Sequence, residues 1–293
     1  MLAIIDGDIP CYSCCPPRYQ SNSKHVSLDA NGKLIYQDIV ELDSEGKYIM
    51  PEFTEEENRR YINTAWSNFK SNHNKLLDTL WTNDYLMAVK GKNNYRDLIY
   101  PEYKQPRVKA QKVDSKYSLS KKIVPIIRDK AVEEGYAIRA DGREADDFIR
   151  IWAEECRAAG KDYIICSMDK DLLCIPGKHY LMHNNLSDDK RIIEVSEADA
   201  LKFYYKQVLM GDNTDNIPGV PGLGPKTADK LLSGLTEEVD FQEVVVEAYF
   251  NKYGPDEWYG YMLSNLKMIH IQKHYHDYCQ DVVDWPIIKE LVL

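Results

Sequence analysis

Three short apolar segments constrain the fold of this 293-residue chain more than any other feature. They are LAIID at residues 2–6, YLMAV at 85–89 and DYIICS at 162–167. Each is too short for a typical helix and reads as a buried β-strand. Helical patterns lie between them, so the order of elements favours an α/β fold built on a mostly parallel sheet. After about residue 200 the pattern is mostly helical and rich in tyrosine.

Two of the intervening helices have recognisable starts. Thr54 and Glu57 match a capping box, and EADDFIRIWAEECRAAG at 144–160 places its acids in the first turn of a helix. Between 16 and 53, SLDANGKLIYQ and ELDSEGKYIM each hold a turn signal between apolar residues, which favours small hairpins. We therefore expect a core at 1–200 with an insertion at 16–53, followed by a helical region at 201–293.

Composition narrows the class of protein. A hydrophobic content of 44% and a charged content of 29% are ordinary for a soluble globular protein. No apolar run approaches the roughly 18 residues that span a bilayer, and no basic segment marks a signal peptide. Seven scattered cysteines suit a reducing cytoplasm. Cys11, Cys14 and Cys15 have no second metal-binding pair, so structural thiols are favoured over a zinc site.

Charge is distributed unevenly along the chain. The net charge is −10, but residues 90–130 carry twelve basic and four acidic side chains. Such a basic stripe on an acidic body is an electrostatic footprint for a polyanion, although a solvated helix face is an equal reading of this feature alone. The stripe therefore permits nucleic-acid binding despite the acidic total.

Carboxylates gather at comparable places along the predicted core, after strands or at helix starts. They are Asp6, Asp8, Glu144, Asp146, Asp147, Asp169, Asp171, Asp212 and Asp215. Ligands of open α/β sheets bind outside the carboxyl ends of the strands, and carboxylates brought together there repel one another unless cations intervene. Oxygen ligands suit Mg²⁺ or Mn²⁺, and two such ions are a standard clamp for phosphodiester hydrolysis. Taken singly, acids in the first turn of a helix are usually caps and acids after a strand usually form a turn, while Asp212 and Asp215 fit an Asx-rich loop equally well.

The segment GDNTDNIPGVPGLGPKTADKLL, residues 211–232, joins two chemistries. Its first part supplies acids, and its middle is a glycine loop that permits close approach of the backbone to another molecule. Lys226 and Thr227 open the helix that follows, whose N–H groups suit a phosphate. The segment thus places a cation-binding end beside a phosphate-binding end.

In this order, the motifs IDGD, PEYKQPR, EADD, SMDKD and GDNTDNIPGVPGLGPKTA resemble those of the flap endonuclease superfamily, most closely its phage and bacterial 5′-nucleases. The resemblance implies a PIN-like α/β core with a helical arch and a helix–three-turn–helix element that holds duplex DNA. It implies a Mg²⁺-dependent 5′→3′ exonuclease and flap endonuclease acting on double-stranded DNA at free 5′ ends, flaps or nicks. The location implied is a bacterial or phage-infected cytoplasm, with a replication protein as a further partner.

The resemblance also implies roles for particular residues. The nine acids would hold two Mg²⁺ or Mn²⁺ ions, and the glycine loop would bind K⁺. The residues that would meet the scissile phosphodiester are Tyr103, Lys104 and Arg107. Those that would steer or grip DNA are Lys109, Lys112, Lys116, Gly222, Gly224, Lys226, Thr227 and Lys230.

One departure from the family pattern leaves alternatives open. Val89 or Lys90 stands where the family usually carries another Asp after the second strand. Two alternatives follow: Asp8 replaces the missing carboxylate, or one metal ion binds more weakly. The rivals to a DNA nuclease are a ribonuclease that removes RNA from RNA–DNA hybrids, a catalytically dead DNA-binding module, and a replication scaffold.

Overall fold

The computed structural model describes residues 1–16, 19–20, 24–32, 34–38, 44, 54–100, 102–104, 119–183, 186–187, 190–279 and 285–288. Its main sheet has six strands in the order β6-β5-β1-β7-β8-β9. The strands are β1 (Leu2–Asp6), β5 (Tyr85–Lys90), β6 (Ile138–Ala140), β7 (Tyr163–Ser167), β8 (Gly177–Leu181) and β9 (Ile192–Val195). All neighbours are parallel except β8 and β9. The three strands expected from the sequence are the three adjacent central strands, and the α/β class is confirmed.

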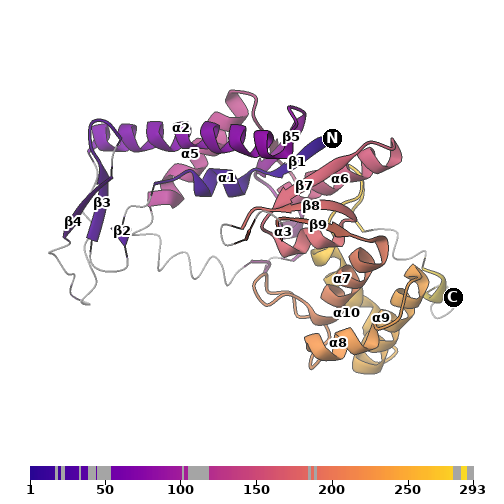
Figure 1. Ribbon diagram of the computed structural model, residues 1–293. Coiled ribbons are helices and arrows are strands. Elements are labelled where there is room, and N and C mark those ends of the chain that lie inside the picture. Colours follow the sequence, from indigo (N-terminus) through magenta and orange to yellow (C-terminus); the bar gives the residue numbers. More distant parts are fainter. Residues whose placement is uncertain are drawn as a thin grey trace.

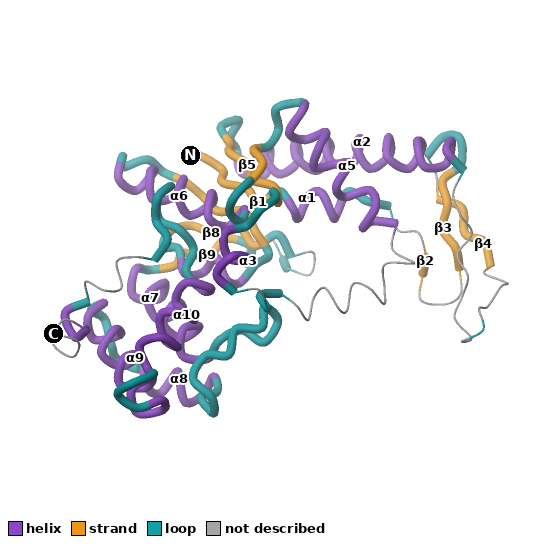
Figure 2. Tube along the Cα trace, turned by 180° about the vertical axis from the view of Figure 1, so that it is seen from behind, coloured by secondary structure: helices purple, strands orange, loops and turns teal. Residues whose placement is uncertain are grey.

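Both faces of this sheet are covered by helices. Along β1, Ile5 belongs to one buried cluster and Ile4 to another, because successive strand residues point to opposite faces. The first face is covered by α1 (Asp8–Ser13), α2 (Glu55–Leu80) and α5 (Leu119–Glu133), and the second by α6 (Ala145–Ala158). Figures 1 and 2, from opposite sides, both show α2 and α5 side by side. Such double coverage explains why the strands read as continuous apolar runs.

The long helix α2 begins as its sequence predicts. The Thr54 hydroxyl accepts a hydrogen bond from the Glu57 N–H at 3.2 Å, and the Glu57 carboxylate accepts one from the Thr54 N–H at 2.9 Å. Cys11 in α1 and Cys14, the residue that caps its C-terminal end, are buried in the core, and the Cys14 thiol donates to the Cys11 carbonyl at 3.2 Å. No described helix combines the length and the apolar character needed to cross a membrane.

The insertion forms a separate small sheet. Its strands are β2 (Tyr19–Gln20), β3 (Lys24–Leu28) and β4 (Leu34–Asp38), in that order and antiparallel. The pairing of β3 with β4 confirms the hairpin predicted for SLDANGKLIYQ. The second predicted hairpin, ELDSEGKYIM, lies outside the described residues apart from Ser44. Figure 1 shows this sheet at the outer end of α2, away from the main sheet.

The last third of the chain is helical. Its helices are α7 (Glu197–Met210), α8 (Pro225–Leu231), α9 (Glu238–Tyr253) and α10 (Trp258–Ile269). The core has two further short elements, the helix α3 (Tyr95–Ile99) and the 3₁₀ turn η1 (Lys170–Cys174). The apolar faces of α7, α8, α9 and α10 form a third buried cluster that includes Tyr205, Phe241 and Met262. Figure 1 shows these helices below the sheet, beside β8 and β9. The boundary near residue 200 stays a prediction, because Tyr204 packs against this cluster and against that of α6.

Candidate functional site: an acidic cavity at the carboxyl edge of the sheet

A cavity of about 410 Å³ lies where the central parallel strands end. Asp6 is the last residue of β1, Asp169 and Asp171 follow β7, and Asp146 lies in the first turn of α6. Parallel neighbours end at the same edge, so these side chains meet there. The carboxylates that line the cavity are Asp6, Asp8, Glu144, Asp146, Asp169, Asp171, Asp212 and Asp215. The structure therefore brings together eight of the nine predicted acids, and we call this space the acidic cavity.

Several of these carboxylates are held near one another at an electrostatic cost. Burial, followed by the charge of Asp8, raises the pKa of Asp6 to about 7, although the Ser167 hydroxyl donates to it at 2.9 Å. Burial and then Asp169 raise the pKa of Asp171 to about 6. Burial and the charge of Asp6 also raise the pKa of Asp146 well above its usual range. Carboxylates with this behaviour are stabilised in their charged form by an added cation.

Tyr103 and Lys104 also line the acidic cavity, beside Glu144 and Asp215. The Tyr103 hydroxyl lies 3.2 Å from Glu144 Oε2 and 3.4 Å from Asp215 Oδ2. The Lys104 ammonium pairs with Glu144 and lies 3.7 Å from Asp215 Oδ2. Burial alone would lower the pKa of Lys104, but these two carboxylates outweigh it and raise the pKa. Lys104 is thus a fixed positive charge in the cavity, on a backbone with the uncommon φ of +55°.

Asp147 does not join the other acids. Its carboxylate is fully buried and forms two hydrogen bonds with Arg96, from Nη1 to Oδ2 at 2.8 Å and from Nη2 to Oδ1 at 2.9 Å. It also accepts the N–H groups of Glu144 at 2.9 Å and Gln272 at 3.0 Å. These contacts make Asp147 a helix-capping and ion-pairing residue. We correct the predicted ligand set by leaving Asp147 out of it.

Val89 and Lys90, at the family's usual acid position, differ in where they lie. Val89 is fully buried in the core, while Lys90 lines the acidic cavity. The N–H of Lys90 donates to Asp8 Oδ1 at 3.1 Å, and Arg128 Nε donates to the same oxygen at 2.8 Å. Asp8 therefore occupies this corner of the cavity, already paired with a cation.

Sequence reasoning missed several side chains of the cavity. Arg128 was counted in the basic stripe, but nothing in its position marked it as a partner of Asp8. Gln207 donates from Nε2 to Asp171 Oδ1 at 2.7 Å and carried no sequence signal. Of the predicted cations, Arg107, Lys109, Lys112 and Lys116 lie outside the described residues.

The acidic cavity offers only oxygen donors for a cation. Within the part of the chain that the structure describes, no three His, Cys, Asp or Glu side chains form one compact metal-binding group. Mg²⁺ does not need such a group, because it keeps several waters and binds through one or two carboxylates. The all-oxygen donor set and the raised pKa values of Asp6, Asp146 and Asp171 fit a hard divalent cation.

The glycine loop connects the acidic cavity to an exposed helix. Within it, a Cβ at Gly211 would lie 2.2 Å from the Ile217 carbonyl oxygen, so only glycine permits this close packing. By contrast, a Cβ at Gly222 or Gly224 would meet nothing within 4 Å. The residues on α8 that are predicted to grip DNA are exposed: Lys226 and Thr227 in its first turn and Lys230 in its last. The structure shows α7, the loop and α8 in succession; a three-turn element that holds DNA stays a prediction.

Comparison with known proteins identifies the family. The family described as "5′-3′ exonuclease, N-terminal resolvase-like domain" matches residues 48–204, which is more than half of the chain. The protein therefore belongs to the 5′-3′ exonuclease family, within the 5′-nuclease superfamily. This confirms the resemblance drawn from the sequence motifs.

Individual relatives agree with this assignment. The chain is 34% identical over 142 residues to a 5′-3′ exonuclease of Aquifex aeolicus, which covers 47% of each protein. It is 30% identical over 143 residues to flap endonuclease Xni of Shewanella amazonensis, covering 47% of this chain and 54% of that protein. The chain spans about half, or less, of the length of the curated relatives it matches.

Solved structures show the same fold. The bacteriophage T5 D15 flap endonuclease, in a pseudo-enzyme-product complex with DNA and metal ions, superposes with a TM-score of 0.60 at 15% identity, covering 99% of this chain and 97% of that one. T5 D15 protein co-crystallised with metal ions also gives a TM-score of 0.60, at 16% identity, covering 99% and 98%.

Proposed function

We propose that this protein is a divalent-metal-dependent nuclease that cleaves DNA phosphodiesters at 5′ ends, flaps or nicks, as a 5′→3′ exonuclease and flap endonuclease. One observation carries the proposal: eight carboxylates line a single cavity, with a charged lysine fixed at its wall. The names of the relatives and the DNA in the T5 complex support this class of substrate.

The proposed ions are two Mg²⁺ or Mn²⁺, held by Asp6, Asp146, Asp169 and Asp171 with help from Asp212. Such ions would polarise the phosphodiester and favour ionisation of the attacking water. The metal ions in the T5 structures support this part of the proposal. A K⁺ ion in the glycine loop, a replication partner and a cytoplasmic location belong to the same proposal.

The remaining residues bind and orient the DNA. Lys104 is kept charged by Glu144 and Asp215, so it can stabilise negative charge that develops on the attacked phosphate. Tyr103 packs beside it and fixes the same two carboxylates. Exposed Lys226 and Lys230 on α8 contact the phosphate backbone without reading bases. Asp212 and Asp215 belong to the same segment, residues 211–232, as Lys226 and Lys230. The position of the bound duplex is therefore coupled to the position of the cleavage site.

A gel assay with labelled substrates tests the proposal. We expect cleavage of 5′-flap, nicked and blunt DNA duplexes with Mg²⁺ or Mn²⁺, and none in EDTA. Undiminished cleavage in chelator, or cleavage confined to an RNA–DNA hybrid, would overturn it. Lys104→Ala should reduce turnover by about 10²-fold or more, whereas Lys75→Ala, on the exposed face of α2, should leave it unchanged. Equal turnover in the two variants would remove Lys104 from the proposed mechanism.

A further inference from the structure

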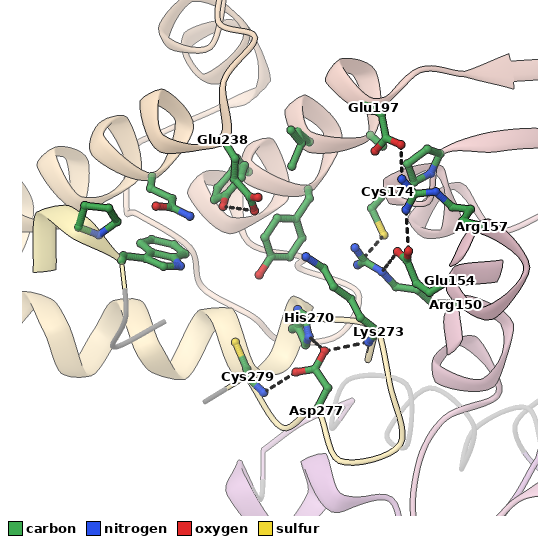
Figure 3. Close-up of a pocket in the computed structure, with 18 residues that line it drawn as sticks. Arg150, Glu154, Arg157, Cys174, Glu197, Glu238, His270, Lys273, Asp277 and Cys279 are labelled. Atoms are coloured by element: carbon green, nitrogen blue, oxygen red, sulfur yellow. Dashed lines mark hydrogen bonds and ion pairs between the residues drawn. The ribbon is translucent and has the colours of Figure 1, made fainter. Parts of the chain in front are cut away.

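A second cavity, of about 500 Å³, lies between α6 and the C-terminal helices α7 and α9 (Figure 3). It shares a wall with the acidic cavity. Along residues 268–273, Ile269 and Ile271 line the acidic cavity, whereas His270 and Lys273 line the second one. Its volume falls within the range of small-molecule sites, which often lie where two packed regions meet. The proposed nuclease chemistry makes no use of this space.

The carboxylates of the second cavity already have partners. Asp277 accepts from His270 Nε2 at 2.7 Å, and from the N–H groups of Lys273 at 2.8 Å and Cys279 at 3.1 Å. Burial alone would raise the pKa of Asp277, but these hydrogen bonds and His270 hold it well below its usual range. The Tyr205 hydroxyl lies 3.1 Å from Glu238 Oε1. This is a stable internal network rather than a set of ligands awaiting a cation.

The carboxylates on the α6 side are engaged in the same way. Arg157 donates to Glu154 Oε2 at 2.6 Å and also pairs with Glu197. Figure 3 shows these three side chains linked to one another at one edge of the cavity. Arg157 balances one of the two negative charges and holds both carboxylates at this edge, which leaves the centre of the cavity to other groups.

Two cations facing the cavity are less completely satisfied. Arg150 is 7% exposed; its Nη1 donates to the Ile271 carbonyl at 3.2 Å, but its buried Nε has no hydrogen-bond partner and lies 3.7 Å from Glu154 Oε1. Among the described residues, the Lys273 ammonium forms no ion pair or hydrogen bond, and Figure 3 shows it extending into the cavity. Two cations that line the same cavity attract an anion, and an arginine suits a phosphate or carboxylate.

The second cavity is also lined by aromatic rings. Tyr204, Tyr205 and Trp285 line it, with the ring of Tyr205 5.0 Å from that of Tyr204 and 6.0 Å from that of Trp285. Such rings stack on flat ligands. The buried amide of Gln242 lies in the same lining and is hydrogen-bonded to the Tyr205 side chain. A lining that holds both cations and aromatic rings suits a molecule with a flat ring and an anionic group.

We propose that the second cavity binds a nucleoside 5′-monophosphate, with the phosphate between Arg150 and Lys273 and the base against Tyr204 and Trp285. The choice of a nucleotide from this chemical class rests on the proposed function, because a 5′→3′ exonuclease releases such molecules. A bound nucleotide contacts Lys273, at one end of the segment that walls both cavities. The second cavity is therefore placed to sense the product of the first.

The test measures binding by calorimetry on the full chain, without cleavage. In EDTA, dAMP should bind with a stoichiometry of one, and deoxyadenosine or inorganic phosphate should bind at least about tenfold more weakly, since each lacks half of the contacts. Lys273→Met should weaken dAMP binding by about tenfold or more, and Trp285→Leu should weaken it as well. Lys104→Ala should leave it unchanged, because Lys104 lies in the acidic cavity. The unfolding temperature of each variant checks that it is folded; Lys273 is exposed, so its replacement leaves the core intact.

Three results would overturn the inference. They are no saturable binding of dAMP up to about 10 mM, where even a weak site with a millimolar Kd is filled, binding that is lost in Lys104→Ala but kept in Lys273→Met, and equal binding by wild type and both second-cavity variants. Failure of the proposed function is seen separately, as absent cleavage in the gel assay. A chain that binds dAMP at Lys273 but cuts no DNA would reject the nuclease and keep this site.

Discussion

The two cavities share a wall, but the pKa values of their buried carboxylates are shifted in opposite directions. Eight carboxylates and five lysines or arginines line the acidic cavity, while four carboxylates, three cations and His270 line the second. In the acidic cavity, burial and neighbouring acids raise the pKa of Asp6 to about 7. In the second, hydrogen bonds hold the pKa of Asp277 well below its usual range. The role of an acid in these cavities therefore depends on whether it has a hydrogen-bond or ion-pair partner. Acids with partners stabilise the fold, whereas acids with too few cations nearby are suited to bind a metal ion.

Neutralising an acid in the acidic cavity should have the largest effect. Asp146→Asn removes a charge but keeps the shape, and we expect turnover on a 5′-flap substrate to fall by about 10³-fold, because metal ions supply several kcal/mol of transition-state stabilisation. Glu197→Gln, in the second cavity, breaks only a partly exposed pair with Arg157 and should leave turnover within about twofold. Wild-type turnover in Asp146→Asn would break the contrast between the cavities.

Asp147→Asn should act on stability instead of chemistry. It leaves Arg96, which is 1% exposed, without its closest charged partner, so that only Glu144, at 3.6 Å, remains. Removing one member of a buried pair costs on the order of 3–5 kcal/mol; we expect about 3 kcal/mol in urea unfolding, because Asn keeps some of the hydrogen bonds. Asp171→Asn, which relieves repulsion, is the matched control and should unfold no earlier than wild type. A stable Asp147→Asn protein that fails to cleave would return Asp147 to the reaction.

The pH dependence of stability, measured in EDTA, should reveal one titrating group in each cavity: Asp6 in the acidic cavity and His270 in the second cavity. Asp6 has a folded-state pKa of about 7 against an ordinary 3.8, so its contribution to stability is present below pH 3.8 and is lost as pH rises through 7. Burial lowers the pKa of His270 below 6.5, so its contribution is present above pH 6.5 and is lost as pH falls. Each group changes the free energy of unfolding by at most about 1.4 kcal/mol per pH unit.

Two variants separate these contributions. Asp6→Asn should be more stable than wild type at pH 8 and should lose the decline in stability as pH rises from 3.8 to 7. His270→Gln should reduce the decline in the free energy of unfolding below pH 6.5 and should leave its pH dependence above pH 6.5 unchanged. Urea midpoints between pH 5 and 8 are the measurement. Identical pH profiles for wild type and both variants would mean that neither cavity controls the titration.

The smallest expected effect lies far from both cavities. Thr54→Ala removes the side-chain acceptor of the α2 capping box and should cost about 1 kcal/mol of stability. Turnover should not change. This variant shows how much a simple loss of stability affects cleavage, and a large loss of turnover in it would undermine the interpretation of every other variant.

The sequence predicts the centre of the fold better than its edges. The strands β1, β5 and β7 are buried on both faces, so their apolar runs are continuous. The edge strands β6 and β9 were missed because they have three and four residues with several exposed side chains, and β8 because its GKHYL sequence holds a lysine and a buried histidine. The capping box of α2 was predictable because it depends on residues three apart.

In the acidic cavity, the sequence predicts which residue types gather but not which way each side chain points. Asp146 and Asp147 are neighbours, yet about 100° of helix rotation sends one into the cavity and the other to Arg96. Arg96 and Arg128 were counted in the basic stripe, but their charges are taken up by Asp147 and Asp8. Such pairings join residues 51 and 120 positions apart, which no local pattern records.

The position of β1 has a consequence for how the chain is made. This strand precedes both β5 and β7 in the chain, yet it lies between them, and Leu2 pairs with Tyr163. At about 5–20 residues per second, a ribosome needs on the order of 10 s to deliver β7 after β1. Until then Ala3, Ile4 and Ile5, which are fully buried in the finished protein, lack one of their two neighbours. Productive folding therefore waits for pairing over a long sequence separation, which is slow and leaves apolar chain exposed to aggregation or chaperones.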